Sequence, residues 1–151
     1  MKRYVWGFDG QHENIVMVEK RRGPSAVIGR INGVGGKIED DEDGDEAMAR
    51  EFEEEIGITV PTVDWKHRVT LQHETKIWEV EFYWADISEK TFNSIVARLK
   101  TNPTNDVDES IVRLSINDIW AEEVVPNLRW IIPMCMDTGL MSPAMIIDCS
   151  E

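Results

Sequence analysis

The sequence predicts an α+β fold in which helices pack on a mixed β-sheet, and three observations lead to it. Strand-like and helix-like segments follow one another in the order strands, helix, strands, helix, which is typical of layered α/β/α arrangements. A length of 151 residues favours one domain with its own core, which we expect to span residues 1–151. Hydrophobic residues make up 42% of the chain and charged residues 30%, the balance of a globular protein.

The first segments are predicted to be short strands. Arg3–Phe8 and Asn14–Glu19 are rich in apolar and aromatic residues, and the turn-forming pair Asp9-Gly10 separates them. Lys20–Pro24 is predicted to be a basic turn. Ala26–Ile31 is then expected to form another short strand that leads into a glycine loop.

A helix is predicted over Asp45–Ile56. Asp43 or Asp45 can cap its beginning, and Gly57 is a natural C-terminal stop. Apolar residues recur at helical spacing, so the carboxylates of this segment must face elsewhere. These apolar residues are Ala47, Met48, Phe52 and Ile56.

The second half of the chain is predicted to alternate strands with helices. His67–His73 and Ile77–Asp86 form a strand pair, in which Trp78, Val80, Phe82 and Trp84 share one side of the second strand. The remaining predicted elements are a helix over Phe92–Leu99, a loop over Thr101–Asn105, a strand over Ser110–Leu114, a turn through Ile119 capped by Ser115, and a final helix over Asn127–Met136.

Charge and cysteine content narrow the function classes. A net charge of −13 argues against nucleic-acid backbones and anionic membranes as partners. Cys135 and Cys149 form neither a CxxC pair nor a zinc spacing, which favours reduced thiols in a cytosolic protein. The chain shows no signal sequence and no apolar run near the ~18 residues that span a bilayer. We therefore expect a cytoplasmic location.

Three carboxylates are predicted to share one face of the first helix. Glu54 and Glu55 follow Glu51 by three and four residues, a spacing that puts them on the same side of a helix as Glu51. Such a cluster repels itself unless a multivalent cation binds, and oxygen ligands suit Mg²⁺ or Mn²⁺. A solvated acidic face remains the alternative for Glu39–Asp45. The glycines of Asn32–Lys37 allow backbone groups to approach a metal or phosphate closely.

Residues 36–58, GKIEDDEDGDEAMAREFEEEIGI, resemble the Nudix box, G-x5-E-x7-R-E-U-x-E-E-x-G-U with U an apolar residue. This resemblance implies the Nudix α/β/α sandwich with a mixed sheet. It also implies Mg²⁺-dependent hydrolysis of a nucleoside diphosphate linked to another group, with Mn²⁺ as a substitute metal. Every fixed position of the box is filled, by Gly36, Glu42, Arg50, Glu51, Phe52, Glu54, Glu55, Gly57 and Ile58.

The resemblance also implies roles for individual residues. Glu51 and Glu55 match the main metal ligands, Glu54 a further ligand or the general base, and the Gly35 carbonyl an additional ligand. Arg50 matches a residue that orients a carboxylate, although an ordinary i,i+4 pair with Glu54 is the alternative. The remaining candidates are Glu42 as a loop anchor and Glu109, preferred over Asp106 and Asp108, as an acid from outside the box.

Two flanking segments resemble MutT-like enzymes that remove oxidised purine nucleotides such as 8-oxo-dGTP. Asn32–Lys37 (NGVGGK) is similar to their N-G-F-G-G-K segment, and Val125–Pro133 to their base-reading segment. The similarity implies that Asn32 and Asn127 read a purine edge from opposite walls, since an amide both donates and accepts. The segment departs from the pattern at Val125 and Leu128, which stand where related enzymes carry Trp and Asp.

Several assignments keep an alternative. Trp120 or Trp130 can stack on the base, or either can pack in the core. Asn127 can instead be the N-cap of the last helix. Lys37 and Arg22 are candidate phosphate contacts, although the turn that contains Arg22 can equally be solvated.

The favoured reaction is hydrolysis of a purine nucleoside triphosphate to NMP and pyrophosphate. ADP-ribose, a dinucleoside polyphosphate or capped RNA are the alternative substrates, although the chain has no basic stripe for RNA and no room for the N-terminal sheet of ADP-ribose enzymes. A binding module without turnover is the alternative of another class. The expected partner is a small nucleotide, and the choice between monomer and homodimer stays open.

Overall fold

A mixed β-sheet forms the centre of the protein. The computed structural model describes residues 1–11, 14–20, 28–101, 109–137 and 142–149. The strands run in the order β3-β2-β1-β6-β5-β8, with β4 paired to β1 and β7 to β2. Their bounds are β1 Lys2–Gln11, β2 Asn14–Lys20, β3 Ile31–Asn32, β4 Val34–Lys37, β5 Lys66–His73, β6 Trp78–Asp86, β7 Glu109–Ser115 and β8 Ala144–Asp148.

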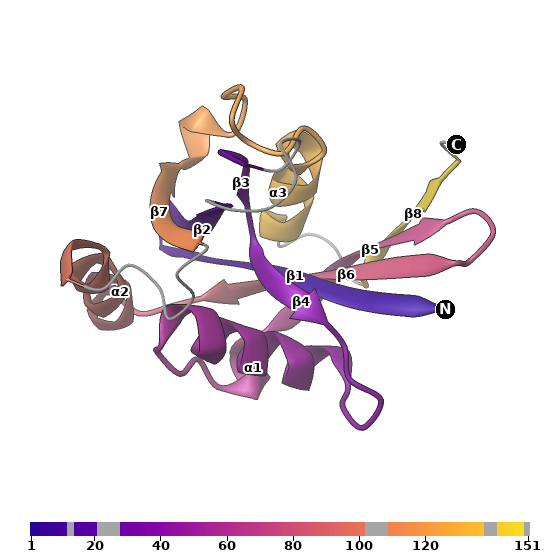
Figure 1. Cartoon of the computed structure of the whole chain (residues 1–151), viewed down its shortest axis with the longest axis horizontal. Coiled ribbons are helices and arrows are strands. Elements are labelled where there is room, and N and C mark those ends of the chain that lie inside the picture. The colour runs from indigo at the N-terminus through magenta and orange to yellow at the C-terminus, as the bar shows by residue number, and fades with distance from the viewer. Residues whose placement is uncertain (12–13, 21–27, 102–108, 138–141, 150–151) are drawn as a thin grey trace.

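Three helices of the described residues flank this sheet. In Figure 1, α1 (Gly44–Ile56) lies below the sheet and α3 (Leu128–Met136) above it, while α2 (Glu89–Thr101) lies near β7. Strand β1 is parallel to β6 and β5 is parallel to β8, whereas the other pairs are antiparallel. The predicted α/β/α sandwich with a mixed sheet is therefore confirmed. No helix within the described ranges combines the length and apolar character needed to cross a membrane.

Each face of the sheet buries its own hydrophobic cluster. On the α1 side, Met48 and Phe52 are fully buried against Trp65 and the sheet. On the α3 side, Leu128 and Ile131 are buried with the apolar residues of β5 and β6. The expected alternation of β6 is confirmed, because Trp78, Val80, Phe82 and Trp84 all belong to the α3-side cluster.

Helix α1 begins and ends as the sequence predicts. Asp43 occupies the N-cap, and its N–H donates to Glu46 Oε1 at 3.0 Å. Gly57 ends the helix with φ 82°, a left-handed conformation that favours glycine, and its N–H donates to the Glu53 carbonyl. Ser115 caps the short turn Ile116–Asp118 by accepting from the N–H of Asn117. The predicted second helix is longer than expected at both ends.

Four local predictions are wrong. The turn at Asp9-Gly10 is absent, because β1 continues through it in register with β6 and β2. A strand was predicted over Ala26–Ile31, but Ile28 and Gly29 form a turn. Residues 26 and 27 of this segment lie outside the described ranges. The glycine segment Val34–Lys37 is strand β4 on β1. Thr101 ends α2 rather than opening a loop, and residues 102–105 lie outside the described ranges.

Candidate active site

The carboxylate of Glu51 lies directly against the backbone of β4. A Cβ built on Gly36 would stand 2.4 Å from Glu51 Oε1, a distance that a real side chain cannot occupy. The register of β4 on β1, with Val5 opposite Gly36, holds this glycine over the helix. Glycine at position 36 is therefore what admits the Glu51 carboxylate to the edge of the sheet.

Arg50 connects the helix, the preceding loop and β4. Its Nε and Nη2 donate to the two carboxylate oxygens of Glu42 at 3.0 and 2.6 Å, and Nη1 donates to Glu51 Oε1 at 3.0 Å. Nη2 also donates to the Lys37 carbonyl at 3.0 Å, whereas both contacts with Glu54 are 3.4 Å. Arg50 is thus more than an i,i+4 partner of Glu54, and its forked guanidinium orients the loop and a carboxylate together.

The electrostatics of this cluster depend on burial and on Arg50. Hydrogen bonds from Arg50 lower the pKa of Glu42, and the same bonds raise the pKa of Arg50. Burial raises the pKa of the half-buried Glu51 carboxyl, while Arg50 acts in the opposite direction and Glu54 adds to the increase. A positive charge beside Glu51 would therefore favour its ionised form.

The donor set of the helix fits a hard divalent cation. Glu51 is held in a space that only glycine leaves open, and its neighbours Glu54 and Glu55 offer carboxylate oxygens. Arg50 Nη1 donates to Glu51 at 3.0 Å and to Glu54 at 3.4 Å, so one guanidinium nitrogen lies beside both carboxylates. Among the described residues, the group of three acids whose ligand oxygens all lie within 4.8 Å of one another is Asp43, Asp45 and Glu46, at the beginning of α1.

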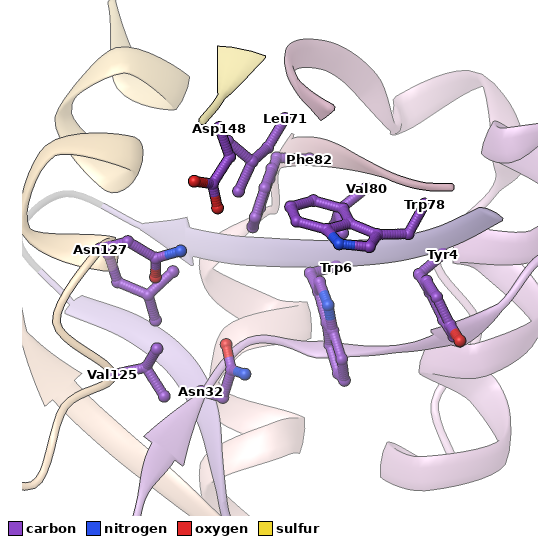
Figure 2. A pocket seen from close by; sticks show the side chains of 11 residues that line it. Tyr4, Trp6, Asn32, Leu71, Trp78, Val80, Phe82, Val125, Asn127 and Asp148 are labelled. Carbon is purple, nitrogen blue, oxygen red and sulfur yellow. The ribbon is translucent and has the colours of Figure 1, made fainter. Parts of the chain in front are cut away.

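A pocket of about 320 Å³ lies on the α3 side of the sheet (Figure 2). Strands β1 and β6 supply its aromatic and apolar floor, and the segment before α3 supplies one wall. Apolar walls with a few polar groups are typical of sites that bind small organic molecules. The polar residues Asn32, Asn127 and Asp148 line the pocket together with the indole rings of Trp6 and Trp78.

Backbone hydrogen bonds bring Asn32 and Asn127 to this pocket. The N–H of Ile31 donates to the Glu123 carbonyl at 2.8 Å, and the N–H of Val125 donates to the Ile31 carbonyl at 3.0 Å. Asn32 is fixed further by its Oδ1, which accepts from the N–H of Gly33 at 2.7 Å. The two asparagines, which lie far apart in the sequence, therefore line one cavity.

The structure bears on the alternative roles of Asn127 and the tryptophans. Asn127 occupies the N-cap position of α3, but its side chain makes no capping hydrogen bond with the described part of the helix. The alternative in which Trp120 or Trp130 packs in the core is wrong, because these side chains are 68% and 43% exposed. Neither indole belongs to the described lining of the pocket, and the guanidinium of Arg129 lies over the Trp120 ring.

The other candidates are dispersed. Lys37 is exposed at the end of β4, and its carbonyl accepts a hydrogen bond from Arg50 Nη2. Gly35 pairs with Trp6 of β1, and a Cβ built on it would stand 2.0 Å from the Val5 carbonyl oxygen. Glu109 is the first residue of β7, opposite Lys20. Arg22, Asp106 and Asp108 lie outside the described residues.

Comparison with known proteins places the chain in a family. The model of the NUDIX domain matches residues 3–133, which is most of its length. The chain belongs to the Nudix family. With its complete box, which extends from Gly36 in β4 through α1 to Ile58, it is a Nudix pyrophosphohydrolase, an enzyme that acts on phosphoric anhydrides. Nudix hydrolases use divalent metals. A comparison with curated protein sequences found no match.

Solved Nudix structures share the fold at low sequence identity. A MutT protein from Bacillus halodurans has a TM-score of 0.69 at 17% identity, covering 99% of this chain and 91% of that one. A MutT NUDIX hydrolase from Burkholderia pseudomallei has a TM-score of 0.65 at 17% identity, covering 88% and 96%. The NUDIX domain of Shewanella oneidensis NrtR, complexed with ADP ribose, has a TM-score of 0.63 at 13% identity, covering 87% and 84%.

Sequence reasoning missed several residues of the pocket in this Nudix protein. Tyr4 and Trp6 had a usable signal, because alternation along β1 places them on one side of the strand. Trp78 was placed on a shared side of its strand but not in a pocket. Asp148 gave no signal, because the strand β8 that carries it was not predicted.

Proposed function

We propose that the protein hydrolyses a purine nucleoside triphosphate to NMP and pyrophosphate. The observation that carries the proposal is the aromatic pocket that Asn32 and Asn127 both line, close in the chain to the box. Asn32 is four residues from Gly36, which contacts Glu51. Four extended residues span about 13 Å, so a nucleotide can place its base in the pocket and its phosphates at the helix.

The box residues are proposed to share the reaction as follows. Glu51 and Glu55 hold the divalent cation, Mg²⁺ or Mn²⁺, with the Gly35 carbonyl as a further ligand. The bound cation neutralises phosphate oxygens and lowers the pKa of water. Glu54, whose side chain is 59% exposed, is accessible to accept the proton of the attacking water or to add a ligand. Arg50 orients Glu51 through its 3.0 Å hydrogen bond.

Base recognition is proposed to combine stacking with amide hydrogen bonds. The indoles of Trp6 and Trp78 provide flat surfaces in the same pocket as the two asparagines. Each asparagine offers one acceptor and two donors, which match the mixed edge of a purine. Trp120 is exposed and is not among the described lining residues, so the proposal assigns it no part in stacking.

ADP-ribose is the second candidate substrate. The observation in its favour is the NrtR NUDIX domain complexed with ADP ribose, which has the same fold. A nucleoside diphosphate derivative would place its base in the same pocket and its pyrophosphate at the same helix. The two candidates therefore differ in the products released and not in the residues used.

A product assay over a nucleotide panel tests the proposal. With Mg²⁺ or Mn²⁺, we expect pyrophosphate from purine triphosphates, including 8-oxo-dGTP, and slower release from pyrimidine triphosphates. AMP with ribose phosphate from ADP-ribose, without pyrophosphate from triphosphates, would favour the second candidate. No product from any nucleotide with either metal would contradict both and indicate a binding module.

Replacing Asn127 with alanine is expected to weaken base discrimination. The change removes one hydrogen-bonding amide from the pocket and leaves α3 intact, because this amide makes no cap bond to the described helix. We expect the ratio of kcat/KM between the best purine and the best pyrimidine triphosphate to fall by about tenfold. The matched control is Asn117→Ala, which removes an exposed asparagine that is not among the described lining residues of the pocket. Equal ratios in wild type and Asn127→Ala would remove Asn127 from base recognition.

A further inference from the structure

Strand β8 adds a charged residue to the base pocket. The family match ends at residue 133, and β8 covers Ala144–Asp148 beyond it. Exposure alternates along β8, with Met145 and Ile147 exposed and the residues between them half-buried. Ile146 packs in the α3-side cluster, so Asp148 projects from the same side of the strand as that residue.

The backbone holds Asp148 in place at the end of β5. Strand β8 runs parallel to β5 with Asp148 opposite His73, and the N–H of Glu74 donates to the Asp148 carbonyl at 3.0 Å. Figure 2 shows the Asp148 carboxylate at the pocket near Asn127. Among the described residues that line the pocket, Asp148 is the one with a formal charge.

This carboxylate determines which part of a nucleotide can occupy the pocket. A fixed negative charge repels phosphate groups and favours groups that donate hydrogen bonds. It therefore favours the base end of the substrate here, while the phosphates remain near α1 with its metal ligands. A carboxylate accepts from two N–H groups at once when they lie side by side.

We propose that Asp148 is a specificity-determining residue that selects purines of the guanine type, an inference that rests on the proposed function placing a purine in this pocket. The N1–H and 2-amino groups of guanine are adjacent donors, and they match the two carboxylate oxygens. Adenine presents an unprotonated N1 and no 2-amino group, so a carboxylate faces its lone pair unfavourably. Hypoxanthine keeps N1–H but lacks the 2-amino group, so its affinity is expected to lie between those of guanine and adenine.

Oxidation at C8 does not change this edge of guanine. Asp148 therefore selects guanine and 8-oxoguanine together against adenine. Any preference between the two guanine forms must come from other groups around the base, such as Asn32 and Asn127.

Metal-free binding of nucleoside monophosphates tests the inference apart from catalysis. Trp6 and Trp78 line the pocket, so tryptophan fluorescence can report a bound base. GMP, IMP and AMP are titrated into wild type and Asp148→Asn, a change that keeps shape and removes charge. In wild type we expect GMP to bind most tightly and AMP least. In the variant we expect GMP affinity to fall by about tenfold or more while AMP affinity stays equal or improves.

The matched control is Glu74→Gln. Glu74 is exposed and adjacent to the end of β8, so this change removes one negative charge without changing the lining of the pocket. This control is expected to leave the ratio of GMP affinity to AMP affinity at the wild-type value. For all variants, the ratio of kcat/KM on GTP to kcat/KM on ATP is measured as well.

A GMP-to-AMP ratio that is the same in Asp148→Asn and wild type overturns the inference. If purine triphosphates are still hydrolysed to NMP and pyrophosphate in that case, the proposed function survives without Asp148. If no purine nucleotide binds or is hydrolysed, the proposed function fails and the inference fails with it.

Discussion

Replacing Glu54 with glutamine is expected to lower kcat on the best substrate by about a hundredfold or more, because the change removes the proposed proton acceptor or charged ligand. Folding is expected to stay near normal, since the side chain is 59% exposed and its contacts with Arg50 are 3.4 Å long. Steady-state pyrophosphate release with Mg²⁺, together with a thermal melt of the same sample, measures both effects.

Glu53→Gln is the matched control for this prediction. Glu53 is exposed on the same helix, is not a fixed position of the box, and carries the same charge. It is expected to retain turnover within about twofold of wild type, in line with the small effects of exposed surface changes. Wild-type turnover in Glu54→Gln would remove Glu54 from the reaction, and an equal loss in both variants would point to overall charge instead.

Replacing Gly36 with alanine is expected to lower activity and Mn²⁺ affinity by about 10–100-fold, the range seen when the support of a metal ligand is changed. The new Cβ would stand 2.4 Å from Glu51 Oε1, so the carboxylate must move away from β4. The atom that must move is the end of a flexible side chain, so we expect the fold to persist. Mn²⁺ titration followed by electron paramagnetic resonance measures the affinity directly.

Gly29→Ala separates this effect from general destabilisation. A Cβ at Gly29 meets nothing within 4 Å, but φ is +77°, so alanine strains the turn without reaching Glu51. We expect this control to melt at a lower temperature and to bind Mn²⁺ as the wild type does. If Gly36→Ala keeps full Mn²⁺ affinity, the close packing of Glu51 under β4 has no role in metal binding.

Local signals predicted the helix of the box well and the first strands less well. The cap at Asp43, the apolar side of α1 and the stop at Gly57 all depend on residues within a few positions of one another. The Asp9-Gly10 turn failed because β1 pairs with β6 across that dipeptide, and strand pairing outweighs a local turn preference. Strand β8 depends on β5, which lies more than seventy residues earlier, so no local pattern revealed it.

The candidate site also combines features that local spacing predicted with contacts that only the structure shows. The spacing of Arg50, Glu51 and Glu54 on one helix turn was visible in the sequence, and the structure adds the bonds from Arg50 to Glu42 and Lys37. The shared pocket of Asn32 and Asn127 came from resemblance, and the structure supplies its cause in the hydrogen bonds between Ile31 and residues 123–125. The choice of Trp120 did not match the lining, because exposure of an indole cannot be read from its neighbours in sequence.

The sequence by itself determined the chemistry of the box, because helical periodicity places residues three and four apart on one face whatever the rest of the chain does. Tertiary structure decided what surrounds it. Gly36 meets Glu51 only because β4 lies on β1, and Asp148 reaches the pocket on the α3 side only because β8 lies on β5. Strand partners are chosen by packing between distant segments, so the residues that select a substrate depend on contacts that no local pattern records.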